Sequence, residues 1–367
     1  MLSRIYALII KELLALLRDK KSRLVLIVPP LVQLLIFSFA ATQEVKNQTL
    51  AVLNLDRGRT ALTLVQEFSA ATTFSEVIYL ECAEDIPAVI DRQEAIAVLW
   101  IPETFSRDLE RGQLAQASFI IDGRKTNAAQ IIQGYGMRIV NRYRSELAAN
   151  ARPAGIDLIS RNWFNPNLNF RWYTVPSLVC VLTTVIGLLV TGLSVARERE
   201  MGTFEQLLVS PLHPLEILLG KALPALLIAM VEGAFIVLIG VFLLQVPFNG
   251  ALPLLFGSMA VFLLAIIGVG LFVSSLSMTQ QQAVLGVFMF MVPAVILSGF
   301  ASPIENMPHW LQTLSFGNPV RYFMTIVRGI FLKDISAGIV WQQTWPMLII
   351  ACITLSMATW LFKKRME

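Results

Sequence analysis

The chain has 367 residues, of which 56% are hydrophobic and 15% are charged, and its mean hydropathy is +0.66. This composition is more apolar than that of average soluble proteins, so we expect a polytopic α-helical membrane protein. The net charge of +4 does not imply a nucleic-acid partner, because the excess Lys and Arg lie beside apolar runs, where topology and lipid headgroups account for them. The three cysteines have no metal-ligand spacing and predict no disulfide framework.

The amino-terminal region predicts a surface helix followed by a membrane span. Residues 2–18 have apolar side chains on one side of a helix and Arg4, Lys11 and Arg18 on the other, which predicts an amphipathic helix lying on the membrane. We assign residues 24–43 to the first transmembrane helix, because the apolar run is long enough to cross a core of ~30 Å. A cleaved secretory signal is the alternative, but Pro29 and Pro30 and the long helical region before the run favour an uncleaved anchor.

Residues 44–172 have the pattern of a soluble α/β domain inserted between the first two spans. Strand-like runs at residues 50–55, 77–80, 96–101 and 118–121 alternate with helical stretches at residues 62–71, 85–92, 103–110 and 126–149. This alternation predicts some parallel strand pairing. The segment contains no histidine, so it carries no His-based triad or His metal cluster.

Residues 173–362 predict transmembrane helices two to six, in the apolar runs 175–196, 222–246, 251–276, 283–300 and 345–362. Residues 302–344 predict a re-entrant outer segment. Lys and Arg number six before the first span, three between Arg197 and Lys221, three in the tail at residues 363–367, and three in the re-entrant segment. This bias predicts that both termini are cytoplasmic and that the α/β domain is outside.

Few polar features lie inside the predicted spans. Glu232 is the only ionisable residue expected there, and it indicates either ion coupling or substrate contact, or else a protonated or partnered glutamate between helices. Thr183, Gly187 and Thr191 recur every four residues, which favours helix packing, with a translocation path as the alternative. No G-x-x-x-x-G-K-[ST] motif occurs, so nucleotide energy must come from another chain.

A charged stretch follows the second span. It contains Arg197-Glu198-Arg199-Glu200, is interrupted at Gly202, and continues with Thr203, which has Gln206 three residues on as in a capping box. The pattern predicts a short helix at residues 204–209, because Pro211 prevents its continuation. We interpret it as a contact device, and an ordinary interfacial loop is the alternative.

Three segments together resemble the permease subunits of type-2 ABC exporters, in the bacterial branch with a large periplasmic domain between the first two transmembrane helices. They read IIKELLALLRDKKSRLVLIVPP, AREREMGTFEQLLVSP, and SGFASPIENMPHWLQ followed by NPVRYFMTIVRGIFLKD. The resemblance covers essentially the whole chain. It implies an elbow helix in residues 1–23 and a coupling helix near residues 203–210 that docks on a separate ATP-binding subunit. The expected docking residues are Arg197, Glu198, Glu200, Gly202, Thr203, Phe204, Glu205 and Leu208.

The resemblance also implies two permease subunits in a bacterial inner membrane, with ATP and magnesium in the partner chain and no cofactor, metal or catalytic residue in this one. Such systems often work with a periplasmic adaptor and an outer-membrane channel. We therefore expect export of an amphipathic or lipophilic compound. An ATP-driven mechanical envelope protein is the alternative. A secondary transporter is a weaker one, because it should show inverted repeats and more embedded ionisable groups, and we find neither.

Overall fold

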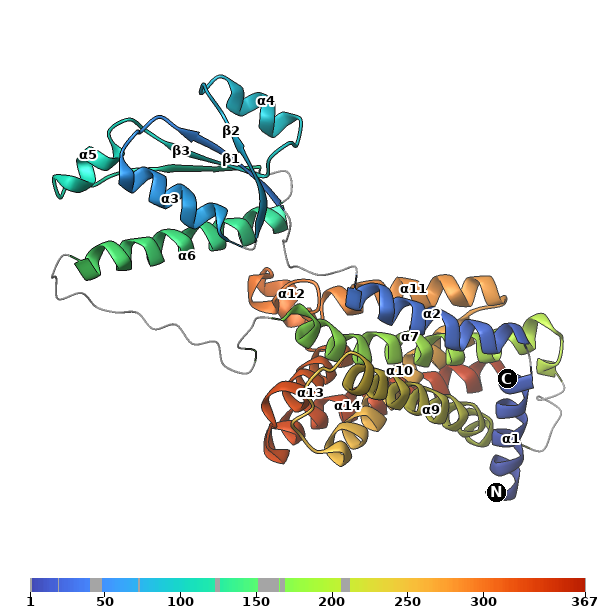
Figure 1. Ribbon diagram of the computed structural model, residues 1–367. Helices are drawn as coiled ribbons and strands as arrows, with labels where there is room; N and C mark the ends of the chain where they lie inside the picture. Colours follow the sequence, from blue (N-terminus) through green and yellow to red (C-terminus); the bar gives the residue numbers. More distant parts are fainter. Residues whose placement is uncertain are drawn as a thin grey trace. The chain divides into compact units, whose positions relative to one another are not determined.

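The computed structural model describes residues 2–18, 20–39, 48–71, 73–122, 126–150, 165, 169–205 and 212–366. The chain divides into two compact units (Figure 1). The helical unit comprises Met1–Ala41 and Asn162–Glu367, and the sheet unit comprises Thr42–Arg161.

The helical unit is that of a polytopic membrane protein. Among the described residues, four helices are long and apolar enough to cross a membrane, namely Phe170–Glu200, Pro214–Leu243, Leu252–Leu276 and Ala337–Lys364. Two shorter apolar helices, Ile27–Ser38 and Gln280–Ile296, lie where the first and fifth spans were expected. The number of six spans stays a prediction.

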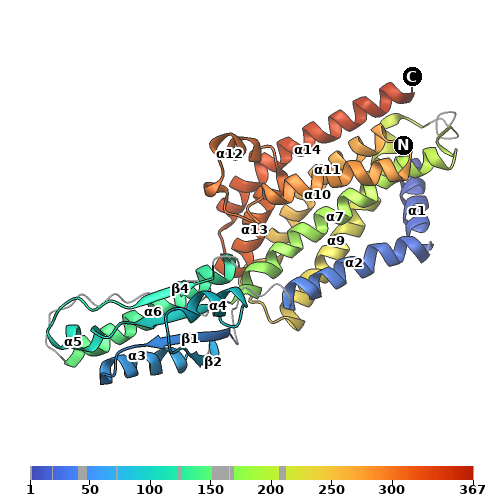
Figure 2. The ribbon, with the colours of Figure 1, turned by 90° about the horizontal axis from the view of Figure 1, so that it is seen from above.

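The elements of the helical unit are α1 (Leu2–Arg18), α2 (Lys20–Phe39), α7 (Phe170–Glu200), α9 (Pro214–Leu238), the π-helical turn η1 (Ile239–Leu243), α10 (Leu252–Leu276), α11 (Gln280–Ile296), the 3-10 turn η2 (Ile304–Asn306), α12 (His309–Ser315), α13 (Pro319–Lys333) and α14 (Ala337–Met366). Helix α7 packs against α2, α9, α10, α11 and α13, and α14 packs mainly against α10. The two chain termini lie at the same end of the unit as the carboxyl end of α7 and the start of α9, and α12 and α13 lie at the other end (Figures 1 and 2).

Helix α9 begins eight residues before the apolar run that predicted it. The N–H of His213 donates to Glu216 Oε2 at 3.0 Å, and Pro214 occupies the first helical turn, a combination that marks a helix start independently of hydropathy. Glu216 and Lys221 therefore lie inside the helix, and both are 5% exposed. Hydropathy locates the apolar run and not the start of the helix, so these two ionisable residues were not expected in α9. That Glu232 is the only ionisable residue within a span stays a prediction.

The sheet unit is a four-stranded sheet covered by helices on both faces. Its elements are β1 (Gln48–Asn54), α3 (Arg59–Ser69), β2 (Phe74–Tyr79), α4 (Asp85–Asp91), β3 (Ala97–Ile101), α5 (Phe105–Glu110), β4 (Ser118–Ile121) and α6 (Thr126–Asn150). The strand order is β2-β1-β3-β4, in which β1 pairs in parallel with β2 and β3, and β4 is antiparallel to β3. Each element lies within a few residues of the range expected from the sequence.

The two faces of the sheet follow the two-residue period of the strands. Leu50 and Val52 of β1 pack with α3 and α6, whereas Ala51 and Leu53 pack with α4 (Figure 1). All four side chains are 0% exposed. The sheet unit therefore has a hydrophobic core of its own on each face.

A buried carboxylate joins two loops at the carboxyl ends of the parallel strands. Asp56 Oδ1 accepts a hydrogen bond from the N–H of Gly58 at 2.6 Å, and Oδ2 accepts one from the N–H of Ser106. Burial by itself raises the pKa of Asp56, but the hydrogen bonds from Ser106 and Gly58 outweigh it, so the pKa lies below its ordinary value of 3.8. The ionised carboxylate thus ties the loop after β1 to the start of α5.

Candidate docking and coupling site

Helix α7 ends in a tight turn that redirects the chain. Gly202 has a φ of +69°, in the left-handed region that favours glycine, and its N–H donates to the Arg199 carbonyl at 3.1 Å. The N–H and the hydroxyl of Thr203 both donate to the Glu198 carbonyl, at 2.9 and 3.3 Å. The Thr203 hydroxyl is therefore a donor here, whereas a capping box would use it as an acceptor.

Phe204 and Glu205 are helical, as the sequence predicted for the start of a short helix. Residues 206–211 lie outside the described residues, and they include Leu208, Gln206 of the expected capping box and the remainder of the helix predicted at residues 204–209.

A mostly buried ionic cluster ties the end of α7 to α1 and α9. Lys221 Nζ lies 2.7 Å from Glu198 Oε2 and 3.1 Å from Glu12 Oε1, and it also donates to Ser194 Oγ at 3.1 Å. Lys11 Nζ donates to Glu198 Oε1 at 3.1 Å. We call Lys11, Glu12, Glu198 and Lys221 the Lys221 cluster. Its central pair is desolvated, so each charge depends on the others for compensation.

Close backbone packing holds α1 at this position. A Cβ atom on Gly220 of α9 would lie 2.7 Å from the Cβ of Leu8 in α1, so only glycine fits there. The contact places Glu12, one turn further along α1, beside Lys221.

Arg199 and Glu200 hold the connection between α10 and α11. Arg199 Nη1 donates to the carbonyls of Ser275 and Ser277 at 2.9 and 3.0 Å, at the carboxyl end of α10. Glu200 Oε2 accepts from the N–H of Gln280 at 2.9 Å, in the first turn of α11, where a carboxylate suits the free N–H groups. Glu200, expected on the docking surface, therefore also binds within its own chain.

Phe204 and Glu205 point in different directions. Phe204 is 8% exposed and packs with Val195, Ile217 and Phe362. Its ring meets the ring of Phe362 in α14 edge-on, with 5.9 Å between the centroids, and the Arg199 guanidinium covers it at 4.8 Å. Glu205 is exposed, as are Gly202 and Thr203, whereas Arg197 is partly buried.

The small-residue stripe lies in helix packing. Thr183 and Thr191 are 0% exposed, and their hydroxyls donate to the carbonyls of Val179 and Gly187 one turn earlier in α7. A Cβ atom on Gly187 would lie 3.1 Å from Ile266 of α10. The stripe thus brings α10 close to α7, as small residues do between membrane helices.

Glu232 is separate from these contacts. It lies on α9, is partly exposed, and makes no hydrogen bond with the stripe; its Oε1 is buried without a hydrogen-bond partner in the described part of the chain. A translocation role for the stripe or for Glu232 stays a prediction.

Three members of the Lys221 cluster were not predicted as site residues from the sequence, namely Lys11, Glu12 and Lys221. Lys221 could have been placed in a helix from the sequence His213-Pro214-Leu215-Glu216. Proline at the first helical position and glutamate at the third mark a helix start, and Lys221 follows within the same helix. No comparable signal marks Lys11 or Glu12, since Glu198 and Lys221, with which they pair, lie about 200 residues away in the chain.

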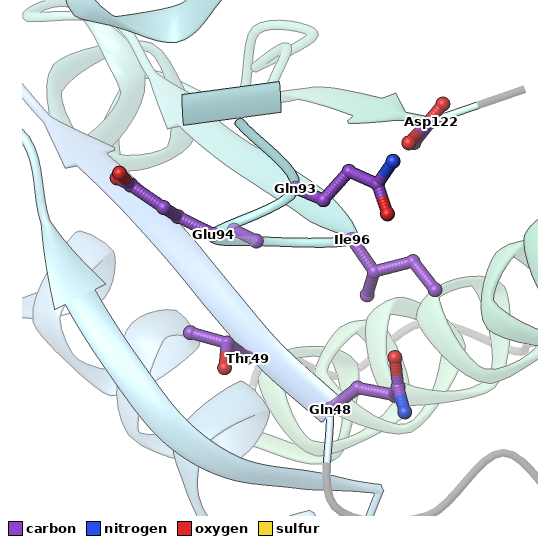
Figure 3. Close-up of a pocket in the computed structure, with 7 residues that line it drawn as sticks. Gln48, Thr49, Gln93, Glu94, Ile96 and Asp122 are labelled. Atoms are coloured by element: carbon purple, nitrogen blue, oxygen red, sulfur yellow. The ribbon is translucent and has the colours of Figure 1, made fainter. Parts of the chain in front are cut away.

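The sheet unit offers a small polar pocket as an alternative site (Figure 3). Its volume is about 90 Å³, and it is lined by Gln48, Thr49, Gln93, Glu94, Ala95, Ile96 and Asp122. Small-molecule sites typically measure about 300–1,000 Å³, so this pocket has room only for a few waters. The described residues contain no group of three or more His, Cys, Asp or Glu that could hold a metal ion.

The model of the ABC-2 family transporter proteins matches residues 20–361. The chain is 45% identical, over the full length of both proteins, to the probable multidrug ABC transporter permease YbhR of Escherichia coli K12. It is 31% identical to the probable multidrug ABC transporter permease YbhS of the same strain, covering 99% of this chain and 97% of YbhS. The inner membrane transport permease YhhJ of that strain is 27% identical, with 99% and 98% covered.

Proposed function

The chain belongs to the ABC-2 family of transporter proteins and is a type-2 ABC permease, and from this premise we propose that it is the transmembrane subunit of an ABC exporter. A separate subunit hydrolyses ATP and holds the nucleotide and magnesium. The permease moves an amphipathic or lipophilic compound outward. The similarity to YbhR and YbhS, both probable multidrug ABC transporter permeases, supports this class of cargo.

One observation carries the coupling part of the proposal: residues 198–204 contact five helices of the unit, namely α1, α9, α10, α11 and α14. Glu198 reaches α1 and α9 through Lys221. Arg199 and Glu200 reach α10 and α11, and Phe204 reaches α14. Because packed helices move as rigid bodies, a displacement of this turn passes into the whole bundle.

The docking surface consists of the exposed residues Gly202, Thr203 and Glu205 together with the short helix that Phe204 begins. The ATP-binding subunit docks there, with Leu208 contributing an apolar contact. A second permease subunit completes the transporter. A periplasmic adaptor and an outer-membrane channel extend the pathway.

In the proposed topology the protein lies in the bacterial inner membrane with both termini in the cytoplasm. The positions of the termini and of the α7–α9 connection, all at one end of the helical unit, support this (Figure 2). Residues 1–23 form the elbow helix, 24–43 the first span, 44–172 the periplasmic α/β domain, and 363–367 the cytoplasmic tail. Residues 173–362 carry the other spans, with the outer segment at 302–344.

Copurification and activity together test the coupling proposal. The chain is isolated from its native membranes, the ATP-binding protein that follows it is identified, and the pair is reconstituted in liposomes with a fluorescent lipophilic dye. We expect Glu205→Lys to lower partner binding and dye transport about tenfold or more, because it reverses an exposed charge in the first helical turn.

Glu110→Lys provides the matched control, since Glu110 is an exposed acid in the sheet unit. It should leave binding and transport unchanged. Wild-type binding and transport by Glu205→Lys would remove the coupling assignment.

A mechanical function remains a second candidate because of the sheet unit, whose own core makes it able to act on a partner outside the membrane. Deletion of this unit separates the two functions. Retained dye transport with loss of an envelope phenotype would favour the mechanical function.

A further inference from the structure

Among the described residues, no carboxylate pairs with either of two arginines on one side of α13. Arg321 and Arg328 are seven residues apart, close to two turns of the helix. The Arg321 guanidinium lies 4.3 Å from the centre of the Phe316 ring, and Nη1 donates to Ser315 Oγ at 2.6 Å. Within the described residues, the hydrogen bonds of both arginines all go to neutral groups.

Arg328 is enclosed more completely than Arg321. Its Nε donates to Ser177 Oγ at 2.8 Å, its Nη1 donates to the Gly299 carbonyl at 3.3 Å, and its guanidinium carbon lies 4.0 Å from the centre of the Tyr173 ring. Its Nη2 is buried and has no hydrogen-bond partner among the described residues. A buried donor without a partner is costly, and a buried cation without an anion is costlier. The part of the chain that the structure describes therefore provides no acceptor for Nη2.

Tyr173 covers this guanidinium. Its hydroxyl donates to the carbonyls of Gly299 and Phe300 at 3.3 and 3.1 Å, in a turn where Gly299 has a φ of +83°. Tyr173 itself is 36% exposed, so it separates Arg328 from the surroundings of the unit. Rotation of this one side chain would uncover the guanidinium.

The position of the two arginines in the chain is also unusual. Tyr173 and Ser177 belong to the first turns of α7, at the end opposite to Glu200, which is the outer end in the proposed topology. Lys and Arg are generally fewer on that side, yet residues 302–344 hold three of them. The preference for Lys and Arg on the cytoplasmic side therefore does not explain the three cationic residues of this outer segment.

We propose that Arg328, assisted by Arg321, binds the phosphate or carboxylate headgroup of an anionic amphiphile at the outer end of the helical unit. A planar guanidinium pairs well with the two oxygens of such a group, and Nη2 supplies the free donors. The rings of Tyr173 and Phe316 flank the two cations and offer contact to the apolar part of the ligand. This inference deepens the proposed function and rests on it for the side of the membrane.

Binding of short-chain phosphatidylglycerol to the purified full chain, in a neutral detergent, tests the proposal. The wild type should prefer this lipid to short-chain phosphatidylcholine. Arg328→Gln should weaken binding about tenfold or more, because the removed group is desolvated, and Arg328→Lys should restore part of it. Lys333→Gln is the matched control: it removes one charge from the same helix at an exposed position, and it should have little effect.

A simpler explanation is that Arg328 only supports the carbonyls after α11. Equal binding of the two lipids by the wild type, or equal losses in Arg328→Gln and Lys333→Gln, would establish it and overturn the proposal. Displacement of the lipid by glycerol phosphate at the same concentration would overturn the assignment to an amphiphile.

Arg328→Gln can fail by misfolding, so a second variant is needed. Tyr173→Phe keeps the ring and removes the hydroxyl that fixes the cover, so it should bind phosphatidylglycerol more tightly than the wild type; unchanged or weaker binding would contradict the role of Tyr173. The ATP-binding subunit is absent from these measurements. A negative result in the lipid-binding measurements would therefore not contradict the export proposal. A negative result in the transport measurements would likewise not contradict the lipid-binding site.

Discussion

Lys221 Nζ lies 2.7 Å from Glu198 Oε2, in a contact where both side chains are at most 10% exposed. The oxygen makes no hydrogen bond of good geometry, so the contact is an ion pair. It joins the last turn of α7 to the second turn of α9, directly behind the proposed docking surface. Removing one partner of such a pair leaves an uncompensated buried charge.

Lys221→Met should therefore destabilise the helical unit by about 3–5 kcal/mol, since the carboxylates of Glu12 and Glu198 would lose their shared cation. Thermal unfolding in detergent measures the effect. Lys11→Met is the control, because the Lys11 side chain is 55% exposed and its loss should cost only about 0–1 kcal/mol. Equal losses in the two variants would show that burial of the pair contributes nothing.

Gly202→Ala should cost about 1–2 kcal/mol, because an alanine resists the left-handed conformation that the turn after α7 requires. Gly112 in the sheet unit has a similar φ of +67°, and a Cβ atom at either glycine would meet no other atom within 4 Å. Gly112→Ala should cost the same. Only Gly202→Ala should lower ATPase stimulation and transport, and an equal loss from both variants would argue against a special role of the α7 turn.

Glu232→Gln should keep most of the transport activity. Its buried Oε1 has no partner in the described residues, as suits a neutral side chain between helices, and glutamine has nearly the same shape. Dye transport by the reconstituted transporter is the measurement. Loss of transport with normal expression and normal ATPase stimulation would assign Glu232 to the pathway.

Cys82 reports on the side of the membrane that holds the sheet unit. It is exposed, so an impermeant maleimide should label it in cells whose outer membrane is permeabilised, whereas cysteines introduced at residues 2 and 366 should stay protected. The neighbouring Asp85 carboxylate is the main cause that raises the pKa of Cys82 above 9.0, so labelling should quicken as pH rises. Asp85→Asn should speed it at neutral pH. Labelling of either terminus from outside would overturn the topology.

Asp56 should make the sheet unit sensitive to acid. Its folded pKa lies below 3.8, so the ionised carboxylate stabilises the unit above the unfolded pKa, and this contribution is lost as pH falls through the folded value. Pepsin should cut wild-type sheet units increasingly as pH falls below about 4. Asp56→Asn should be cut more readily throughout, with a weaker dependence on pH. An unchanged pH profile in the variant would exclude Asp56 as the cause.

The order of the helices and strands could be predicted from the sequence, because each of them forms where the local pattern of apolar and polar residues favours it. Alternation predicted β1 to β4 within a few residues, and hydropathy predicted α7 and α10 almost to their ends. The start of α9 was missed because its signal lies in Pro214 and Glu216, which are capping residues and not part of the apolar run.

The candidate site was readable only in part, for a physical reason. Gly202 and Thr203 are residue types that favour a helix end and a turn, and the structure has a turn at these residues. The burial of Glu198, the use of Glu200 at α11 and the contact of Phe204 with Phe362 depend on residues from distant parts of the chain. A pattern within one segment contains no information about such partners.

The insertion of the sheet unit between α2 and α7 sets an order of assembly during synthesis. Helix α2 packs against α7, and Leu34 is fully buried in that contact, yet about 130 residues separate the two helices. At about 5–20 residues per second, a ribosome needs on the order of ten seconds to make the segment between them. During that interval α2 lacks its partner α7, whereas the sheet unit, whose cores lie within residues 50–143, can already pack. In the nascent protein the sheet unit can therefore fold before the helical bundle assembles.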